Sequence, residues 1–478
     1  MRRLALALVV PALVALAACD PQDVSTIARK HDPVVLTGAG LPSLAGASPE
    51  RIVAYSYNRF VDPPWRQVPV QVDERHTVDL QDVHAGTSAG SLPVLAYSDP
   101  STLTGADPDA TFDADDELVF MAGDAFGQAR GPGAGAPPGT VGAGVEVTVE
   151  DPLRPGERAW LYLFRSDGSL DPGAGRDYVE YSFDLLAGDY PDDYDFDGRP
   201  DPVGNPPSAP APPANPEDSR VRSAHYELHF LDRWITDVLR IRSRGASGVD
   251  ILDRNRNHFA PGVCGRSEQT FAAGHGAFVT NKDGPVRAIR DYVGANSGTY
   301  TQRRHVFYAQ REDVTTFLRV HSLAEGPDDL LDLSPAASGM RYRSDVAPGG
   351  VTVDGVPDAV TAGALAWELY EGPQGSLVVA HSTDTDLTLA ATSRYVDDTT
   401  PSPLPCTGSD AQEWGAAGSV LTGALPNTDP LRGAAARLVF TRTHYFAPPG
   451  LTTADAAARA AGSRTPFAVS VDAPWPAP

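Results

Sequence analysis

Arginine, histidine and tyrosine are concentrated between residues 287 and 321 of a chain that is otherwise acidic. Abstraction of the proton beside the carboxylate of a uronic acid requires these three residue types. An arginine neutralises the carboxylate, and a tyrosine or histidine takes the proton and supplies one to the leaving oxygen. The candidate catalytic residues for this chemistry are His305, Tyr308, Arg319 and His321. The candidate substrate-binding residues are Arg287, Arg290, Tyr292 and Arg304.

Three interpretations of this segment stay open. A lyase acting on uronic-acid polymers requires that the segments 303–309 and 317–321 pair, so that His305 shares a face with Arg319 or His321. A groove that binds an anionic saccharide needs the same residues without catalysis, with aromatic rings stacked on sugar faces. Alternating arginines also suit the solvent face of a sheet, where they only improve solubility.

A second polar set lies on the segment 223–232. Its residues alternate, with Tyr226, Leu228 and Phe230 on one face and His225, Glu227 and His229 on the other. Two histidines and a carboxylate are zinc ligands in many proteins. Residues i and i+4 of a strand are about 13 Å apart, so the outer histidines are badly placed to share one ion. We therefore favour a polar solvent face over a zinc site.

The stretch DDYDFDGRPD, residues 192–201, places aspartates in a D-x-D-x-D-G-x-x-D pattern. Calcium takes six to eight oxygen ligands, and alternating aspartates on a tight loop supply them. The pattern resembles the calcium loops of EF-hands, dockerins and thrombospondin-type repeats. That resemblance implies a structural calcium ion held by Asp193, Asp195, Asp197 and Asp201. It departs from the EF-hand at the twelfth position, which is Gly204, and the flanks are not helical. The alternative is a solvated acidic turn.

Another acidic cluster, residues 107–117, precedes a hydrophobic segment. Its spacing differs from the calcium pattern, and we expect its aspartates to cap local backbone amides. The segments 68–75 and 113–127 together are similar to the P-x-Q-x-D and D-E-L-x-F pattern of secreted bacterial proteins of uncharacterised function, some associated with polysaccharide use. This resemblance covers about the first third of the chain after residue 18.

Short alternating segments must position these residues. Forty-five glycines and 44 prolines separate segments rich in Val, Leu, Tyr, Phe and Thr, as in 51–60, 157–166, 304–311 and 436–446. Frequent turns and period-two alternation predict an all-β fold with two β-sandwich-like regions. One helix is expected over 452–462, where alanines favour helix and Thr453 is a candidate cap.

The proline-rich segment from Pro202 to Ser219 predicts an extended linker or a long loop. The expected organisation follows from it: signal peptide 1–18, tether 19–29, N-terminal β-rich domain 30–190, acidic loop and linker 191–218, and C-terminal sandwich-like domain 219–478.

The first residues specify export. Arg2 and Arg3 precede an apolar run that is too short to span a membrane comfortably, as in a secretory signal. The run ends in Leu16-Ala-Ala-Cys19, which resembles the lipobox of bacterial lipoproteins. That resemblance implies cleavage before Cys19, acylation of its thiol, and anchoring in the cell envelope, facing either the periplasm or the exterior. The alternative is an ordinary signal peptide.

Two cysteines remain after Cys19. In an exported protein, Cys264 and Cys406 predict one disulfide, the alternative being two separate buried thiols.

The net charge of −24 argues against nucleic acid as a partner and against electrostatic docking on anionic lipid. The favoured function is binding of a polysaccharide or a structural role in the envelope, with a uronic-acid lyase as the alternative. The sequence lacks the phosphate-binding, dinucleotide-binding, zinc-protease and serine-hydrolase motifs.

Overall fold

The computed structural model describes residues 22–80, 92–130, 134–186, 216–259, 267–272, 275–295, 301–319, 327–400, 412–426, 428 and 436–475. Across these ranges the chain forms antiparallel sheets and two α-helices, α1 (Glu268–Ala272) and α2 (Thr453–Arg464), so the predicted all-β fold is confirmed. Short 3-10 helices occupy Gly38–Gly40, Pro49–Arg51, Ala122–Asp124 and Pro335–Ala337. None of the described helices is long and apolar enough to cross a bilayer.

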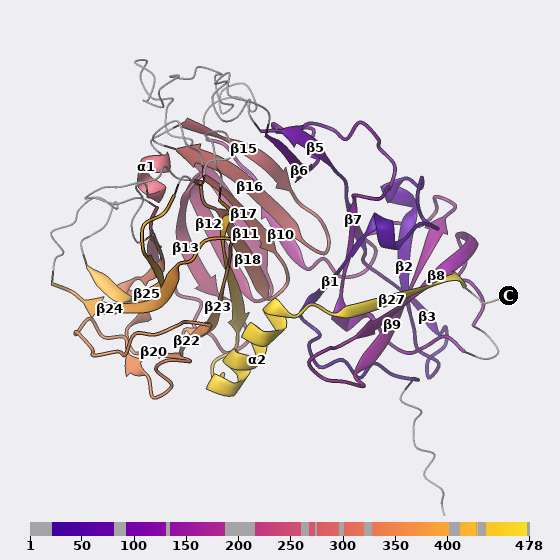
Figure 1. The fold of residues 1–478 in the computed structure, drawn as a ribbon. Helices are drawn as coiled ribbons and strands as arrows, with labels where there is room; N and C mark the ends of the chain where they lie inside the picture. Colours follow the sequence, from indigo (N-terminus) through magenta and orange to yellow (C-terminus); the bar gives the residue numbers. More distant parts are fainter. Residues whose placement is uncertain are drawn as a thin grey trace, which may run out of the picture.

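The largest element is a nine-stranded antiparallel sheet in the C-terminal lobe (Figure 1). Its strands, in order across the sheet, are β15 (His275–Lys282), β16 (Ala288–Ala295), β17 (Thr301–Phe307), β18 (Arg311–Phe317), β26 (Leu438–Ala447), β23 (Gly375–Thr385), β22 (Trp367–Gly372), β20 (Arg341–Ser344) and β21 (Val351–Thr352).

Two four-stranded sheets cover one face of this large sheet. The first contains β10 (Val179–Ser182), β11 (Pro216–Ser223), β12 (Tyr226–Asp232) and β13 (Ile235–Ile241); the second contains β14 (Leu252–His258), β19 (Asp328–Leu333), β25 (Glu413–Thr422) and β24 (Ala390–Asp398), in the order β14-β19-β25-β24. The apolar side chains of all three sheets form one continuous core. Tyr226 of β12 stacks on Phe446 of β26 with ring centroids 4.2 Å apart, and Leu228 and Phe230 are buried beside it. The predicted inward face of 223–232 is therefore confirmed.

The N-terminal lobe is a smaller sandwich. Its five-stranded sheet contains β27 (Ala468–Trp475), β8 (Thr140–Glu150), β9 (Arg158–Ser166), β2 (Ile52–Tyr57) and β3 (Trp65–Val68); its three-stranded sheet contains β1 (Pro33–Thr37), β7 (Glu117–Met121) and β4 (Gln71–Asp73). Alternate apolar residues from both sheets meet in a second core. The hairpin of β5 (Arg75–Asp79) and β6 (Pro93–Tyr97) extends from this lobe.

The N-terminal lobe and α2 pack against the other face of the nine-stranded sheet. Val119 and Met121 of β7 contact Val286 and Tyr308, and the β5–β6 hairpin packs on β15 and β16. α2 packs through its small side chains Ala456 and Ala460. The nine-stranded sheet thus packs on one face against the two four-stranded sheets and on the other face against the N-terminal lobe and α2 (Figure 1).

The chain passes from the N-terminal lobe to the C-terminal sandwich before β10 and returns at β27, which differs from the predicted division at residues 190 and 219. β10 pairs with β11 and so belongs to the C-terminal sandwich. β27, which the prediction placed in the C-terminal domain, pairs with β8 across the N-terminal lobe. β27 and β8 lie more than three hundred positions apart, so no local pattern marks their pairing.

Candidate functional site

The arginines predicted to bind substrate are buried and paired with carboxylates. Arg287 reaches Asp73 at 2.8 Å and Glu117 at 2.6 Å. Arg290 makes a bidentate contact with Glu217, and both side chains are fully buried. The pKa of Asp73 agrees with this pairing. Burial alone would raise it, but the cations of Arg287 and Lys282 lower it, so the carboxylate is charged.

Arg304 and Tyr292 also bind partners inside the protein. Arg304 donates to Asp291 at 2.7 Å, and Tyr292 shares a hydrogen bond of 2.9 Å with His305. Neither a saccharide groove nor a solvent-facing row of arginines describes this arrangement. These side chains belong to the interior of the protein. The carboxylate beside each arginine offsets the free-energy cost of removing that cation from water.

The predicted catalytic residues are also enclosed. His305 lies on the sandwich side of the nine-stranded sheet, where its Nδ1 contacts Glu312 at 2.8 Å and His444 contacts the other Glu312 oxygen at 2.7 Å. Burial lowers the pKa of His305 to about 4, so the ring is neutral near pH 7. Burial would raise the pKa of Glu312, but the hydrogen bonds from His305 and His444 hold it well below its usual range.

The remaining catalytic candidates do not join His305. Tyr308 is buried on the opposite side, where it lines a cavity of about 180 Å³ between the lobes. Arg319 is buried and contacts Gln302. His321 lies outside the described residues. The described candidates therefore do not form one open site that a polymer could enter.

The polar residues of the segment 223–232, which contains β12, are divided among three separate sets of partners. His225 contacts Ser243 and Gln310, while Glu227 pairs with arginines of β13 and the turn that follows it. His229 lies between Asp218 at 2.6 Å and Asp237 at 2.5 Å. The three do not converge on a common ligand position, in agreement with the spacing argument. Glu227 and His229 are nevertheless buried, whereas a solvent face was predicted.

The acidic cluster 107–117 is built as expected from backbone caps. Asp116 accepts the amides of Arg75 and Asp113, and Asp107 accepts the amide of Asp109. The carboxylates of Asp113, Asp115 and Asp116 lie within 4.8 Å of one another. Their hydrogen bonds to local amides explain this proximity without an ion.

Several predicted positions fall outside the described residues. These are the calcium candidates Asp193, Asp195, Asp197 and Asp201, the cysteines Cys264 and Cys406, and the lipidation residue Cys19. They remain predictions.

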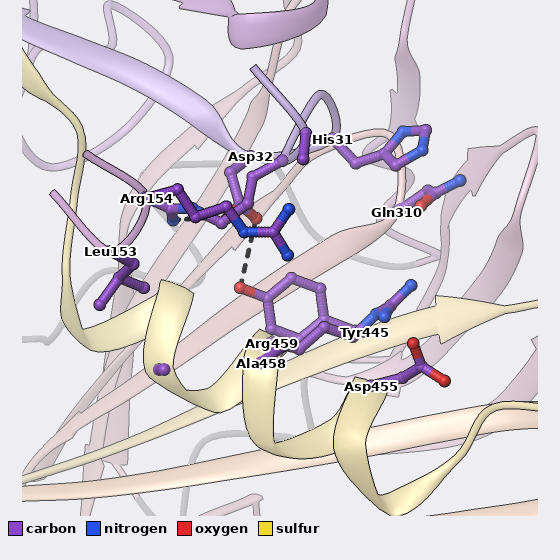
Figure 2. A pocket seen from close by; sticks show the side chains of 12 residues that line it. His31, Asp32, Leu153, Arg154, Gln310, Tyr445, Asp455, Ala458 and Arg459 are labelled. Carbon is purple, nitrogen blue, oxygen red and sulfur yellow. Dashed lines mark hydrogen bonds and ion pairs between the residues drawn. The ribbon is translucent and has the colours of Figure 1, made fainter. Parts of the chain in front are cut away.

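A larger cavity of about 440 Å³ lies between the lobes, and we call it the interlobe cleft. Its lining comes from five segments: Ala28, Arg29, His31 and Asp32; Leu153 and Arg154; Gln310; Tyr445; and Asp455, Ala458, Arg459 and Ala461 of α2. Figure 2 shows the α2 side chains on one side of the cleft, His31, Asp32 and Gln310 on the other, and the Tyr445 ring between them.

Arg29 connects three of the segments that surround the cleft. Its guanidinium makes two hydrogen bonds to Asp151 in the turn between β8 and β9, and one to Asp32. It also donates to the carbonyl oxygens of Gly462 and Thr465 at the end of α2. A cation suits the C-terminal end of a helix because the last carbonyls have no partner in the helix. Arg29 thereby ties α2 to both the first described segment and the N-terminal lobe.

α2 is placed by its own sequence. Thr452 accepts the amide of Asp455, and Asp455 accepts the amide of Thr452, which completes a capping box. The cap is Thr452, one residue before the predicted Thr453. Ala456 and Ala460 face the sheet one turn apart, so Arg459, beside them on the helix, reaches the cleft.

Two arginines that line the cleft, Arg154 and Arg459, take little part in ion pairs within the protein. Arg459 makes no hydrogen bond or close ion pair among the described residues, although its charge, after the hydrogen bonds from Thr452, also lowers the pKa of Asp455 one turn earlier on α2. Arg154 makes a 3.5 Å contact with Glu157 at the surface. The Tyr445 hydroxyl donates to Asp32 at 3.3 Å, which fixes its ring. Gln310 is oriented by its bond to His225, whose pKa burial lowers to about 4. This arrangement can bind an anion beside an aromatic ring and hydrogen-bonding groups.

Sequence reasoning did not find the interlobe cleft because no segment carries a motif for it. The cleft residues come from four stretches of the chain, 28–32, 153–154, 310 and 445–461, which are more than a hundred positions apart and meet only after both lobes have formed. The available signal was Arg459, a cation in the middle of an alanine-rich segment.

Comparison with known proteins identifies no family. No protein-family model and no curated protein matches the chain. Among solved structures, heparan sulfate lyase HepC from Pedobacter heparinus is similar with a TM-score of 0.28 and 9% identity, over 49% of this chain and 34% of that one. A mutant of the same enzyme gives 0.27 and 9%, over 53% and 38%. The chain thus matches little more than a third of either structure. Similarity at this level does not transfer an activity.

Proposed function

We propose that this protein is a lipid-anchored protein of the bacterial cell envelope that binds an acidic saccharide in the interlobe cleft. One observation carries the proposal: Arg459, which makes no hydrogen bond or close ion pair among the described residues, lines a cavity of about 440 Å³ together with Arg154 and the fixed ring of Tyr445. Pockets of about 300–1,000 Å³ hold small ligands.

The lining groups favour an acidic sugar over other ligands of that size. Guanidinium groups form strong charge-assisted hydrogen bonds with carboxylates and sulfates. His31 and Gln310 offer hydrogen bonds to hydroxyls, and the Tyr445 ring provides an apolar face. A purely apolar ligand would desolvate Arg459 without pairing it, at a cost of a few kcal/mol (roughly 1–3 or more). The net charge of −24 disfavours nucleic acid.

The proposal is tested with a panel of uronic-acid oligosaccharides, using neutral oligosaccharides of the same length as controls. Isothermal titration calorimetry should show heat for the acidic members, weakening as salt rises because the contacts are ionic. Binding restricted to neutral sugars, or no binding across the panel, would contradict it.

The same samples distinguish binding from cleavage. A lyase leaves an unsaturated uronate that absorbs in the ultraviolet, whereas a binding protein leaves the absorbance flat. Rising absorbance that disappears in a His31→Ala variant would replace the binding proposal with a lyase that uses the interlobe cleft.

Calcium and the disulfide belong to the proposal as stabilising features. A chelator should lower the melting temperature of the wild-type protein, and an Asp195→Ala variant should show no such response, because the loop would no longer hold the ion. A melting temperature indifferent to chelator would leave 192–201 as an acidic turn. For Cys264 and Cys406, peptide mapping without reductant should give one linked pair.

A further inference from the structure

One exposed apolar pair lies away from both cores. Among the described residues, Phe60 and Val61 are the only consecutive large hydrophobic side chains that are exposed, at 55% and 53%. Phe60 is also the only aromatic ring in that exposed set. Single exposed apolar residues are ordinary, whereas an adjacent pair that includes an aromatic calls for a partner.

The pair is held outward by an ordered hairpin, the tip loop Asn58–Pro64 between β2 and β3. The amide of Asn58 donates to the carbonyl of Pro64 at 2.8 Å, and the amide of Phe60 donates to the Asn58 side chain at 3.0 Å. β3 is the edge strand of the five-stranded sheet, so the tip loop lies at the margin of that sheet. The hydrogen bonds fix the loop without burying its apolar side chains.

The tip loop adjoins the start of the described chain. Arg59 contacts Asp23 at 2.8 Å, and Arg130 lies 3.7 Å from the same carboxylate. Both arginine side chains are partly exposed, at 54% and 41%. Cys19 is four residues before Asp23. Four residues span at most about 14 Å, so a membrane anchor at Cys19 would be tethered within that distance of Asp23, the residue that Arg59 of the tip loop contacts.

We propose that the tip loop is a second membrane contact beside the lipid anchor. Phe60 and Val61 would enter the boundary between headgroups and acyl chains. This proposal rests on acylation of Cys19. The acyl chains supply the affinity, and the short tether keeps the loop at the surface, so that even a small apolar area sets the orientation of the lobe.

The test introduces a fluorescent reporter at the tip. Full-length lipidated protein carrying Phe60→Trp is reconstituted into phosphatidylcholine–phosphatidylglycerol vesicles with or without brominated acyl chains. Bromine quenches indole on contact, so the emission added by the new tryptophan should fall at least about twofold, as expected for a ring at the acyl boundary. The matched control is Val356→Trp, a position 60% exposed in the C-terminal lobe, whose added emission should not change.

Mass spectrometry of the Cys19 peptide separates the two proposals. An acylated peptide together with equal, unquenched emission at both positions would overturn the tip contact and leave the lipid anchor standing. An unmodified Cys19 would overturn both. Quenching at position 60 alone, with acylation, supports both.

Discussion

At the scale of single residues, the polar interior of the C-terminal sandwich determines how the protein responds to acid. Glu312 accepts hydrogen bonds from two histidines in a space that solvent does not reach. His305 has a folded-state pKa of about 4, below the ordinary value of 6.5. The unfolded chain therefore binds more protons than the folded chain between these two values, and stability falls as the pH is lowered through them.

We accordingly predict a loss of about 3 kcal/mol of unfolding free energy from His305 alone between pH 6.5 and 4, since each unit of pKa shift corresponds to about 1.4 kcal/mol. Glu312 adds to this loss at lower pH, because its depressed pKa stabilises the fold only while the carboxylate is ionised. Urea denaturation at several pH values measures the effect. A His305→Gln variant should be less stable overall but should lose less stability over this interval. An unfolding free energy of the wild-type protein that stays the same from pH 7 to pH 4 would contradict the lowered pKa of His305.

Sequence could identify these residues but not their environment. An arginine on a solvent-facing strand and one buried against a carboxylate show the same alternating pattern. The partners of Arg287 and Arg290, which are Asp73, Glu117 and Glu217, lie between 73 and 214 positions away. Pairing at that separation depends on how the lobes dock, which the pattern along one strand does not encode.

At the scale of elements, the sequence predicts best those features that residues close together in the chain determine. Alternation predicted the apolar face of β12, and alanine content with a nearby threonine predicted α2, because side-chain periodicity and capping act within a few residues. The return of β27 to β8 was not predictable in this way. It joins strands more than three hundred positions apart, and its alternation fits any antiparallel neighbour.

The cap of α2 provides a prediction at this scale with a built-in control. Thr452→Ala removes the capping hydroxyl and should lower the unfolding free energy by about 1 kcal/mol. Thr453→Ala changes the adjacent threonine, which is the first helical residue and has no capping bond, so it should have little effect. Denaturant midpoints of the two variants give the comparison. Equal losses, or a larger loss at Thr453, would contradict the assigned cap.

At the scale of the whole molecule, the interlobe cleft exists because both ends of the chain cross the boundary between the lobes. The first described segment brings Arg29 and Asp32 to α2, and the last strand carries the chain from α2 back to the N-terminal lobe. The sequence predicted two β regions but placed the candidate chemistry within one of them. The structure places Arg459 and Arg154 between the lobes, where segments that look unremarkable separately meet.

The most direct test of this account is the affinity of an acidic oligosaccharide for wild-type protein and for two charge-matched variants, measured by titration calorimetry. Arg459→Ala should weaken binding roughly 10- to 100-fold, the equivalent of one charge-assisted hydrogen bond of about 1.5–3 kcal/mol. Arg437→Ala removes the same charge from an exposed surface pair with Asp384, just before β26, and should leave the affinity unchanged. Equal affinities for all three proteins would show that the interlobe cleft is not the binding site.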